Sequence, residues 1–195
     1  MSKSSLNSDY SAPAVIQDIE KAAKAADFTI SSDIPTGSLL RTLAATKPGG
    51  SLLELGTGCG MGTAWILAGM DATAKLTTVD RNAQFSAIAQ RFLSGDPRVT
   101  FFIGDGTAFI ETQPPTSFDF IFADTWPGKF HHLDETLALL KPGGLYIIDD
   151  LLTPGVPVEE HLARVEALIS TLEQRNDLHI TKLNWSSGLI IAVKK

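Results

Sequence analysis

The sequence predicts one α/β domain: a seven-stranded, mostly parallel sheet with helices on both faces and an antiparallel hairpin at its C-terminal end. Three observations support this prediction. Short β-rich runs alternate with helical stretches between residues 51 and 148, which implies β–α–β crossovers and a parallel sheet. A glycine-rich segment follows the first of these runs. Two more β-rich runs close the chain around a short polar turn, which is typical of a hairpin.

The helices follow from amphipathic patterns and from their boundary residues. Pro13 stands near the start of the first, where a missing N–H costs nothing, and Pro48 with two glycines ends the second. The last helix carries an apolar stripe that includes Leu162, Val165 and Leu172. Helices are predicted at residues 13–27, 36–46, 61–69, 82–94, 107–111, 130–140 and 158–176.

The strands are short runs rich in β-branched and apolar residues. The 195 residues fit a single domain spanning 13–195, and the polar first dozen residues, 1–12, are expected to form a flexible arm. Strands are predicted at residues 51–55, 75–80, 99–104, 118–123, 145–148, 178–184 and 188–194. Seven strands that end in a hairpin differ from the six parallel strands of a plain dinucleotide-binding domain.

Composition narrows the classes of partner. The net charge of −6 and pI near 5.1 argue against nucleic acid, which needs a basic face, and favour a small-molecule partner. No apolar run reaches the roughly 18 residues of a membrane span, and the polar N-terminus does not resemble a signal peptide. The single cysteine, Cys59, cannot form an intrachain disulfide, so we expect a cytoplasmic protein. Cys59 is expected to line the pocket of the glycine loop.

The first candidate site is the glycine loop from Gly56 through Thr57 and Gly58 to Gly60, between a strand and a helix. Its glycines allow a tight turn and a close approach of the backbone to a ligand. The same pattern suits a dinucleotide, or a turn that binds nothing. Glu54 at the end of the strand favours a cofactor that carries an ammonium group, which NAD lacks there.

The next two strands add candidate nucleoside contacts. Asp80 stands at a strand tip, where a carboxylate can accept both ribose hydroxyls, and Arg81 beside it is a second candidate. Asp105 and Gly106 follow the third strand and are expected to flank the adenine ring. Alternatively, Asp80 is a surface carboxylate and Asp105 only caps the helix that follows.

Three further carboxylates are expected to converge. Asp124 ends the fourth strand, and Asp149 and Asp150 end the fifth, so all three belong to the edge of the sheet where ligands bind in such folds. Oxygen ligands of this kind suit Mg²⁺ or Ca²⁺. The alternative is that Asp149 and Asp150 only cap the next turn.

With these motifs, the sequence resembles the small cation-dependent O-methyltransferases, such as catechol and caffeoyl-CoA O-methyltransferases and their bacterial relatives. The resemblance covers roughly residues 35–195. It implies a Rossmann-like class I methyltransferase fold, S-adenosylmethionine at the glycine loop and at Asp80, and a divalent cation at Asp124, Asp149 and Asp150. Trp126 resembles the tryptophan that packs on adenine in the catechol enzyme.

The sequence departs from the family's pattern in three places. The metal motif ends in Asp149-Asp150 where the family has Asp-Asn. The candidate base, Lys129, is five residues after Asp124 and not three. Gly62 takes the place of a serine, so Thr63 is expected to contact the carboxylate of the cofactor.

These patterns predict methyl transfer from S-adenosylmethionine to an oxygen of a small, catechol-like acceptor, assisted by a divalent cation. Lys129 and Asp124 are the candidate catalytic residues, and Trp126, Phe130 and Trp185 are expected to line the acceptor site. The adjacent His131 and His132, placed at a helix start, are expected on the surface, because neighbouring helical side chains cannot both face one site. The chain is also expected to be able to form a homodimer. The alternatives are an NAD-dependent oxidoreductase and a non-catalytic nucleoside-binding module.

Overall fold

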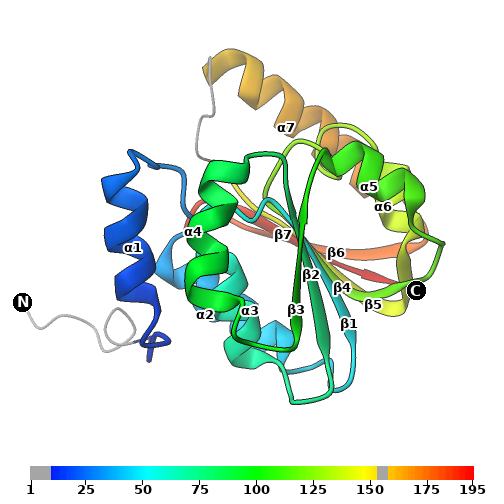
Figure 1. Cartoon of the computed structure of the whole chain (residues 1–195). Coiled ribbons are helices and arrows are strands. Elements are labelled where there is room, and N and C mark those ends of the chain that lie inside the picture. Colours follow the sequence, from blue (N-terminus) through cyan, green and yellow to red (C-terminus); the bar gives the residue numbers. More distant parts are fainter. Residues whose placement is uncertain (1–9, 153–157) are drawn as a thin grey trace, which may run out of the picture.

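A seven-stranded sheet runs through the computed structural model, which describes residues 10–152 and 158–195 (Figure 1). The strand order is β3-β2-β1-β4-β5-β7-β6. The strands are β1 (Ser51–Leu55), β2 (Lys75–Asp80), β3 (Val99–Ile103), β4 (Phe118–Ala123), β5 (Leu140–Ile148), β6 (Leu178–Leu183) and β7 (Leu189–Lys194).

The pairing of the strands confirms the predicted parallel sheet and terminal hairpin. β1 pairs in parallel with β2 and β4, and the pairs β2–β3 and β4–β5 are parallel as well. β7 is antiparallel to both β5 and β6. The order reverses between β1 and β4, so the carboxyl ends of these two strands flank the crevice where sheets of this kind bind ligands.

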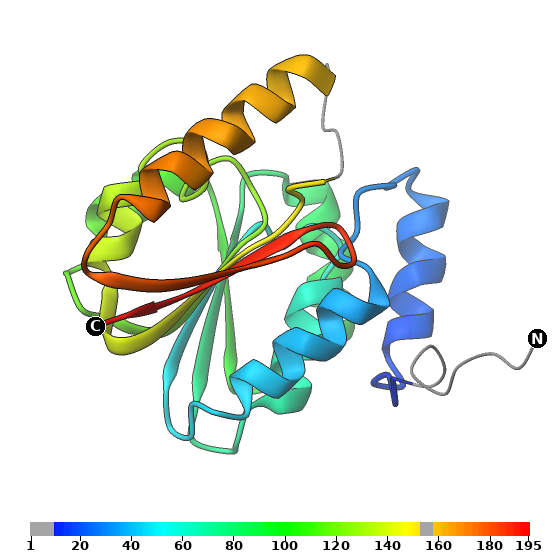
Figure 2. The same ribbon diagram turned by 180° about the vertical axis from the view of Figure 1, so that it is seen from behind.

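The helices form a layer on each face of the sheet (Figures 1 and 2). One apolar core includes Ile19, Leu40 and Trp65 and lies under the first four helices, and a second includes Phe109 and Leu168 and lies under the last three. Because both faces are covered, β1 and β4 read as nearly continuous apolar runs. The helices are α1 (Ile16–Ala25), α2 (Ile34–Ala44), α3 (Met61–Gly69), α4 (Ala83–Leu93), α5 (Gly106–Thr112), α6 (Leu133–Ala138) and α7 (Val158–Glu173).

The largest error in the predicted elements is the helix at residues 130–140, of which only α6 forms. Residues 126–132 fold into a turn in which the Gly128 N–H donates to the His131 carbonyl, with positive φ at Gly128 and His132. Leu140 already belongs to β5. Local sequence did not reveal this turn, and it matters below because it positions Lys129.

Other boundaries differ as well: β5 begins at Leu140 and not at residue 145, and α7 ends at Glu173 and not at residue 176. α1 begins at Ile16, after a turn, and not at Pro13. α2 begins at Ile34, because the Asp33 carboxylate accepts a hydrogen bond from the Thr36 N–H and caps the helix.

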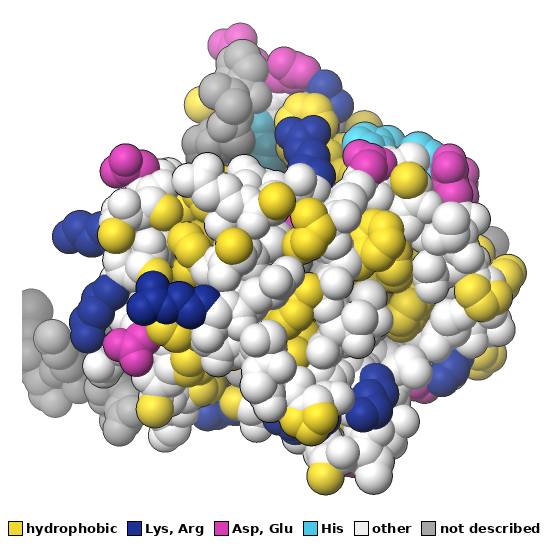
Figure 3. Space-filling view, in the orientation of Figure 1, with side chains coloured by type: hydrophobic (Ala, Val, Ile, Leu, Met, Phe, Trp, Pro, Cys, Tyr) yellow, Lys and Arg dark blue, Asp and Glu magenta, His cyan; other side chains and the backbone are white. Residues whose placement is uncertain are grey.

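The expected N-terminal arm lies mostly outside the described residues, which begin at Tyr10. The Arg41 guanidinium donates to the carbonyls of Tyr10 and Ser11 and so holds the first described residues against α2. None of the described helices combines the length and apolar character needed to cross a bilayer. On the face drawn in Figure 3, basic, acidic and apolar side chains are interspersed and form no continuous basic surface.

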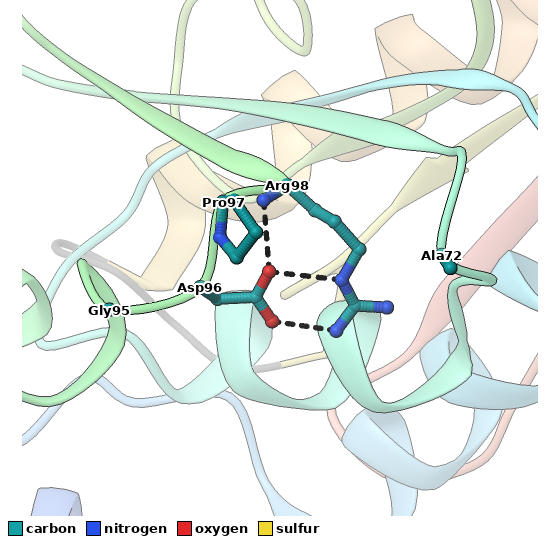
Figure 4. Close-up of a pocket in the computed structure, with 5 residues that line it drawn as sticks. All are labelled: Ala72, Gly95, Asp96, Pro97 and Arg98. Carbon is teal, nitrogen blue, oxygen red and sulfur yellow. Dashed lines mark hydrogen bonds and ion pairs between the residues drawn. The ribbon is translucent and has the colours of Figure 1, made fainter.

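A shallow hollow of about 580 Å³ lies at the amino ends of β2 and β3 (Figure 4). Its lining includes Asp96 and Arg98, which form an ion pair at 2.6 Å, and Arg98 also donates to the Met70 carbonyl at 2.7 Å. These contacts fasten two loops together. The hollow is at the edge of the sheet opposite to the glycine loop, so it is no part of the candidate site.

Candidate functional site

The glycine loop joins β1 to α3 and lies directly against Asp124. Gly56, Gly58 and Gly60 have φ values of +107°, +50° and +95°, which side chains rarely adopt. A Cβ at Gly56 would lie 2.7 Å from the Asp124 carbonyl oxygen. The loop therefore requires glycine here for its conformation and for its contact with β4.

Asp80 fastens this loop at the end of β2. One carboxylate oxygen accepts from the Gly58 N–H at 2.7 Å, and the other accepts from the Asn82 N–H at 2.7 Å. The carboxylate is half-buried, and each oxygen keeps a free lone pair for a ligand hydroxyl. Arg81 is exposed.

Glu54 is fully buried beneath the loop. Its Oε2 accepts hydrogen bonds from the hydroxyls of Thr63 and Thr78, and the Thr78 hydroxyl lies 2.6 Å from that of Thr57. Burial raises the pKa of Glu54 to about 7, against the opposing effect of the two hydroxyls. Its Oε1 is buried with no hydrogen-bond partner among the described residues. Thr63, expected to contact a cofactor carboxylate, is fully buried and donates to Glu54 instead.

The predicted adenine contacts lie on two adjoining segments, the start of α5 and the turn after β4. Asp105 accepts from the Ala108 N–H and caps α5, so the capping alternative holds, while its side chain is exposed. A Cβ at Gly106 would lie 3.2 Å from Pro127, so the start of α5 lies against the turn that carries Trp126. Trp126 is half exposed, with the Arg164 guanidinium 4.7 Å from its ring.

The three predicted carboxylates converge. Asp124, Asp149 and Asp150 each offer an oxygen within 4.8 Å of the others. Ser32 donates to Asp124 at 3.0 Å, and Ser187 donates to Asp149 Oδ1. Asp149 Oδ2 is buried and has no partner among the described residues.

The electrostatics of this cluster are those of crowded negative charges. Burial, then the neighbouring carboxylates of Asp149 and Asp150, raise the pKa of Asp124 well above its ordinary value. Burial likewise raises the pKa of Asp149 to about 6, and the Ser187 hydroxyl opposes that rise. A cation placed among these groups would relieve both desolvation and repulsion, so the donor set fits a divalent ion.

Lys129 reaches the same cluster from the turn after β4. Its side chain is 4% exposed, and Nζ donates to the Asp149 carbonyl oxygen at 2.9 Å. The turn is held by the Tyr146 hydroxyl, which donates to the Gly128 carbonyl. Asp150 has a φ of +60°, a left-handed conformation that aspartate and asparagine tolerate better than most residues.

The groups that close this site from the N-terminal side could not be predicted from the sequence. Ser32 lies 92 positions from Asp124, and Phe28 lies close enough to Gly58 that a Cβ there would be 2.8 Å from its ring. Ser186 in the hairpin turn donates to the Asp33 carboxylate, which joins this N-terminal segment to the hairpin. No local pattern distinguishes these serines from other loop serines.

One minor prediction was wrong. Cys59 does not line the loop's open side: it is 1% exposed and packs in the core, and burial raises the pKa of its thiol to about 11. His131 and His132 stand at the start of α6, as predicted, and their Nδ1 atoms lie 3.2 Å apart. His131 is exposed, as expected.

Comparison with known proteins places these features in a family. Residues 53–151 match the family model described as "Methyltransferase domain". The chain is 31% identical over 117 residues to the "Putative O-methyltransferase" of Mycolicibacterium vanbaalenii, an alignment that covers 57% of this chain and 52% of that protein. The chain thus spans about half the length of the curated relatives it matches.

Solved structures share the fold over nearly the whole chain. An O-methyltransferase from Bacillus cereus in complex with SAH (S-adenosylhomocysteine) superposes with a TM-score of 0.82 at 21% identity, covering 98% of this chain and 94% of that one. The O-methyltransferase TomG of Streptomyces achromogenes, in complex with SAM (S-adenosylmethionine), gives a TM-score of 0.80 at 20% identity, covering 94% and 90%.

Proposed function

The chain belongs to the methyltransferase domain family, and we propose that it transfers a methyl group from S-adenosylmethionine to an oxygen of a small acceptor. One observation carries the proposal: the glycine loop and the carboxylate cluster are in direct contact. A Cβ at Gly56 would lie 2.7 Å from the Asp124 carbonyl oxygen. A methyl donor on the loop and an acceptor at the cluster would therefore be neighbours, as an in-line transfer requires.

The loop and its surroundings fit the parts of S-adenosylmethionine. The Asp80 carboxylate, held by two backbone N–H groups, is suited to accept the ribose hydroxyls. The unpartnered Oε1 of Glu54 would be satisfied by the ammonium group or by a water that bridges to it. Asp105 and Trp126 would contact adenine. The sulfonium itself supplies an activated methyl group, so the residues of this site mainly bind and orient.

The carboxylates of Asp124, Asp149 and Asp150 would hold a divalent cation, Mg²⁺ or Ca²⁺. When bound there, such an ion lowers the pKa of an acceptor hydroxyl and fixes its oxygen. The unpartnered Oδ2 of Asp149 supports a ligand at this point. The proton released by the acceptor would pass to a neighbouring group, for which Lys129 and Asp124 are the two candidates.

An acceptor with two adjacent oxygens suits this arrangement, because both can bind one cation. Apolar side chains exposed near the site fit an aromatic acceptor: Trp126 is 49% exposed, and Trp185, in the turn that carries Ser187, is 42% exposed. Trp185 lies beside a turn and is not fully buried, as predicted. This exposure supports a place for Trp185 in the wall of the acceptor site. Phe130, packed edge-on against Trp126, would extend that wall.

The test combines the cofactor, the cation and the acceptor. We expect calorimetry to detect binding of S-adenosylmethionine and none of NAD. We expect turnover on catechols to stop with EDTA and to return with Mg²⁺, and single-hydroxyl analogues to react far more slowly. Full activity in chelator would remove the cation from the proposal. Binding of NAD would favour an oxidoreductase. Binding of S-adenosylmethionine without turnover on any hydroxyl acceptor would favour a non-catalytic module.

Three broader expectations accompany this function: a cytoplasmic location, no nucleic-acid partner and the capacity to form a homodimer. The first two rest on composition and charge. Fractionation, gel-shift assays and light scattering would check them in turn.

A further inference from the structure

Two departures from the pattern of cation-dependent O-methyltransferases meet at one point of the structure. The first is Asp150, an aspartate where the pattern has asparagine. The second is Lys129, shifted along the chain by the turn after β4. In this structure the lysine Nζ lies 2.9 Å from the Asp149 carbonyl oxygen, beside the carboxylate cluster.

Lys129 is buried among groups that attract a positive charge. Its side chain is 4% exposed, and its Nζ donates to a carbonyl oxygen. Its charge acts on both Asp124 and Asp149, where it favours the ionised carboxylates. A buried ammonium is retained where negative groups surround it.

The charges of the cluster also balance only with the lysine. Three aspartates with one divalent cation leave one negative charge in excess, whereas two aspartates and an asparagine leave none. The ammonium of Lys129 removes that excess. The extra carboxylate and the relocated lysine therefore offset one another.

We infer that Lys129 is a positioning residue, the counter-charge that allows Asp150 to join Asp124 and Asp149 as a third carboxylate around the cation. This inference rests on the proposed function and deepens it, because it assigns Lys129 a role other than that of the base. The proton from the acceptor would then go to a carboxylate of the cluster. A base has to present a free lone pair to the acceptor, whereas Lys129 Nζ is turned to the Asp149 carbonyl oxygen, just after β5.

The test is a charge-compensation series in the full chain, with Mn²⁺ as the probe and calorimetry as the readout. Asp150→Asn keeps an oxygen ligand and removes one negative charge, so it should weaken Mn²⁺ binding by about tenfold. Lys129→Met removes the opposing charge and should tighten binding by about tenfold. The double variant should return to within about threefold of the wild type.

Lys141→Met is the matched control. Lys141 forms an ion pair with Asp119 at 2.7 Å, at the start of β4 and β5 and away from the cluster. Its loss should leave Mn²⁺ affinity unchanged. If Lys129 served only as a base, its loss would likewise leave Mn²⁺ affinity unchanged. Unchanged or weaker Mn²⁺ binding by Lys129→Met therefore overturns the inference.

Thermal unfolding without metal separates this inference from the cation proposal. Lys129→Met should lower the Tm because three carboxylates are left facing one another, and adding Asp150→Asn should recover most of the loss. If the wild type binds no Mn²⁺, the proposed cation fails, but this recovery still tests the counter-charge. No recovery overturns it. Should Lys129→Met not fold, Asp150→Asn alone decides, because unchanged Mn²⁺ affinity in that variant contradicts the charge balance.

Discussion

Substitution of Gly56 by alanine should damage both the stability of the fold and the cofactor site. The backbone φ of +107° is unfavourable for any residue with a Cβ, at a cost of about 1–2 kcal/mol. The new Cβ would also lie 2.7 Å from the Asp124 carbonyl oxygen, which is backbone and cannot rotate away. Overpacking of that kind costs about 1–3 kcal/mol more. The total is about 2–5 kcal/mol of the free energy of unfolding.

Gly143→Ala is the matched control for the backbone part of this cost. Gly143 has a φ of +75°, and a Cβ there would meet nothing within 4 Å. Gly143→Ala should therefore lose only about 1–2 kcal/mol. The two variants are compared by urea unfolding and by calorimetric titration with S-adenosylmethionine, and only Gly56→Ala should weaken cofactor binding.

Equal losses of stability in the two variants would show that the contact between the loop and Asp124 is not tight. Normal cofactor binding by Gly56→Ala would be more serious. It would refute the argument that the glycine loop, seated on β4, is the cofactor cradle.

The other predictions concern the cofactor residues and pH. Asp80→Asn should weaken S-adenosylmethionine binding about tenfold or more in calorimetry, because charge-assisted hydrogen bonds to the ribose are lost; unchanged affinity would remove Asp80 from the site. Trp126→Ala should also weaken cofactor binding in calorimetry while Trp126→Phe largely retains it, and equal affinities in the two would place Trp126 away from adenine. Because the pKa of Glu54 is raised, the folded state keeps a proton that the unfolded state releases above about pH 4.5. The free energy of unfolding should therefore fall by about 3 kcal/mol between about pH 4.5 and pH 7, and this contribution should stay constant above pH 7. Urea unfolding of Glu54→Gln at pH 5 and pH 8 should lack this part of the slope; the same slope as the wild type would mean that Glu54 does not titrate in this range.

The order and type of most elements could be predicted from sequence, because the apolar runs and the glycine loop are local signals. β1 and β4 are buried on both faces, and their nearly continuous apolar runs indicate it. The failure at residues 130–140 has a physical cause. Gly128 and His132 take positive φ values there, and the turn depends on a hydrogen bond from Tyr146, which lies in another strand.

The candidate site could likewise be predicted from the sequence only in part. Asp124 and Asp149 could be placed together, because parallel strands that end at one edge bring their tips together. Ser32 and Ser187 could not, because their contacts with those carboxylates join segments far apart in the chain. The burial of Glu54 beneath α3, with Thr63 donating to it, likewise depends on tertiary contacts.

In the proposed function a cation and a methyl donor share one site at the edge of the sheet. The most direct measurement is anomalous diffraction from crystals grown with Mn²⁺ and S-adenosylhomocysteine. We expect a strong manganese peak among the carboxylates of Asp124, Asp149 and Asp150, with the cofactor on the glycine loop and its ribose at Asp80. A structure with the cofactor bound and no peak at those carboxylates, at saturating Mn²⁺, would contradict this proposal.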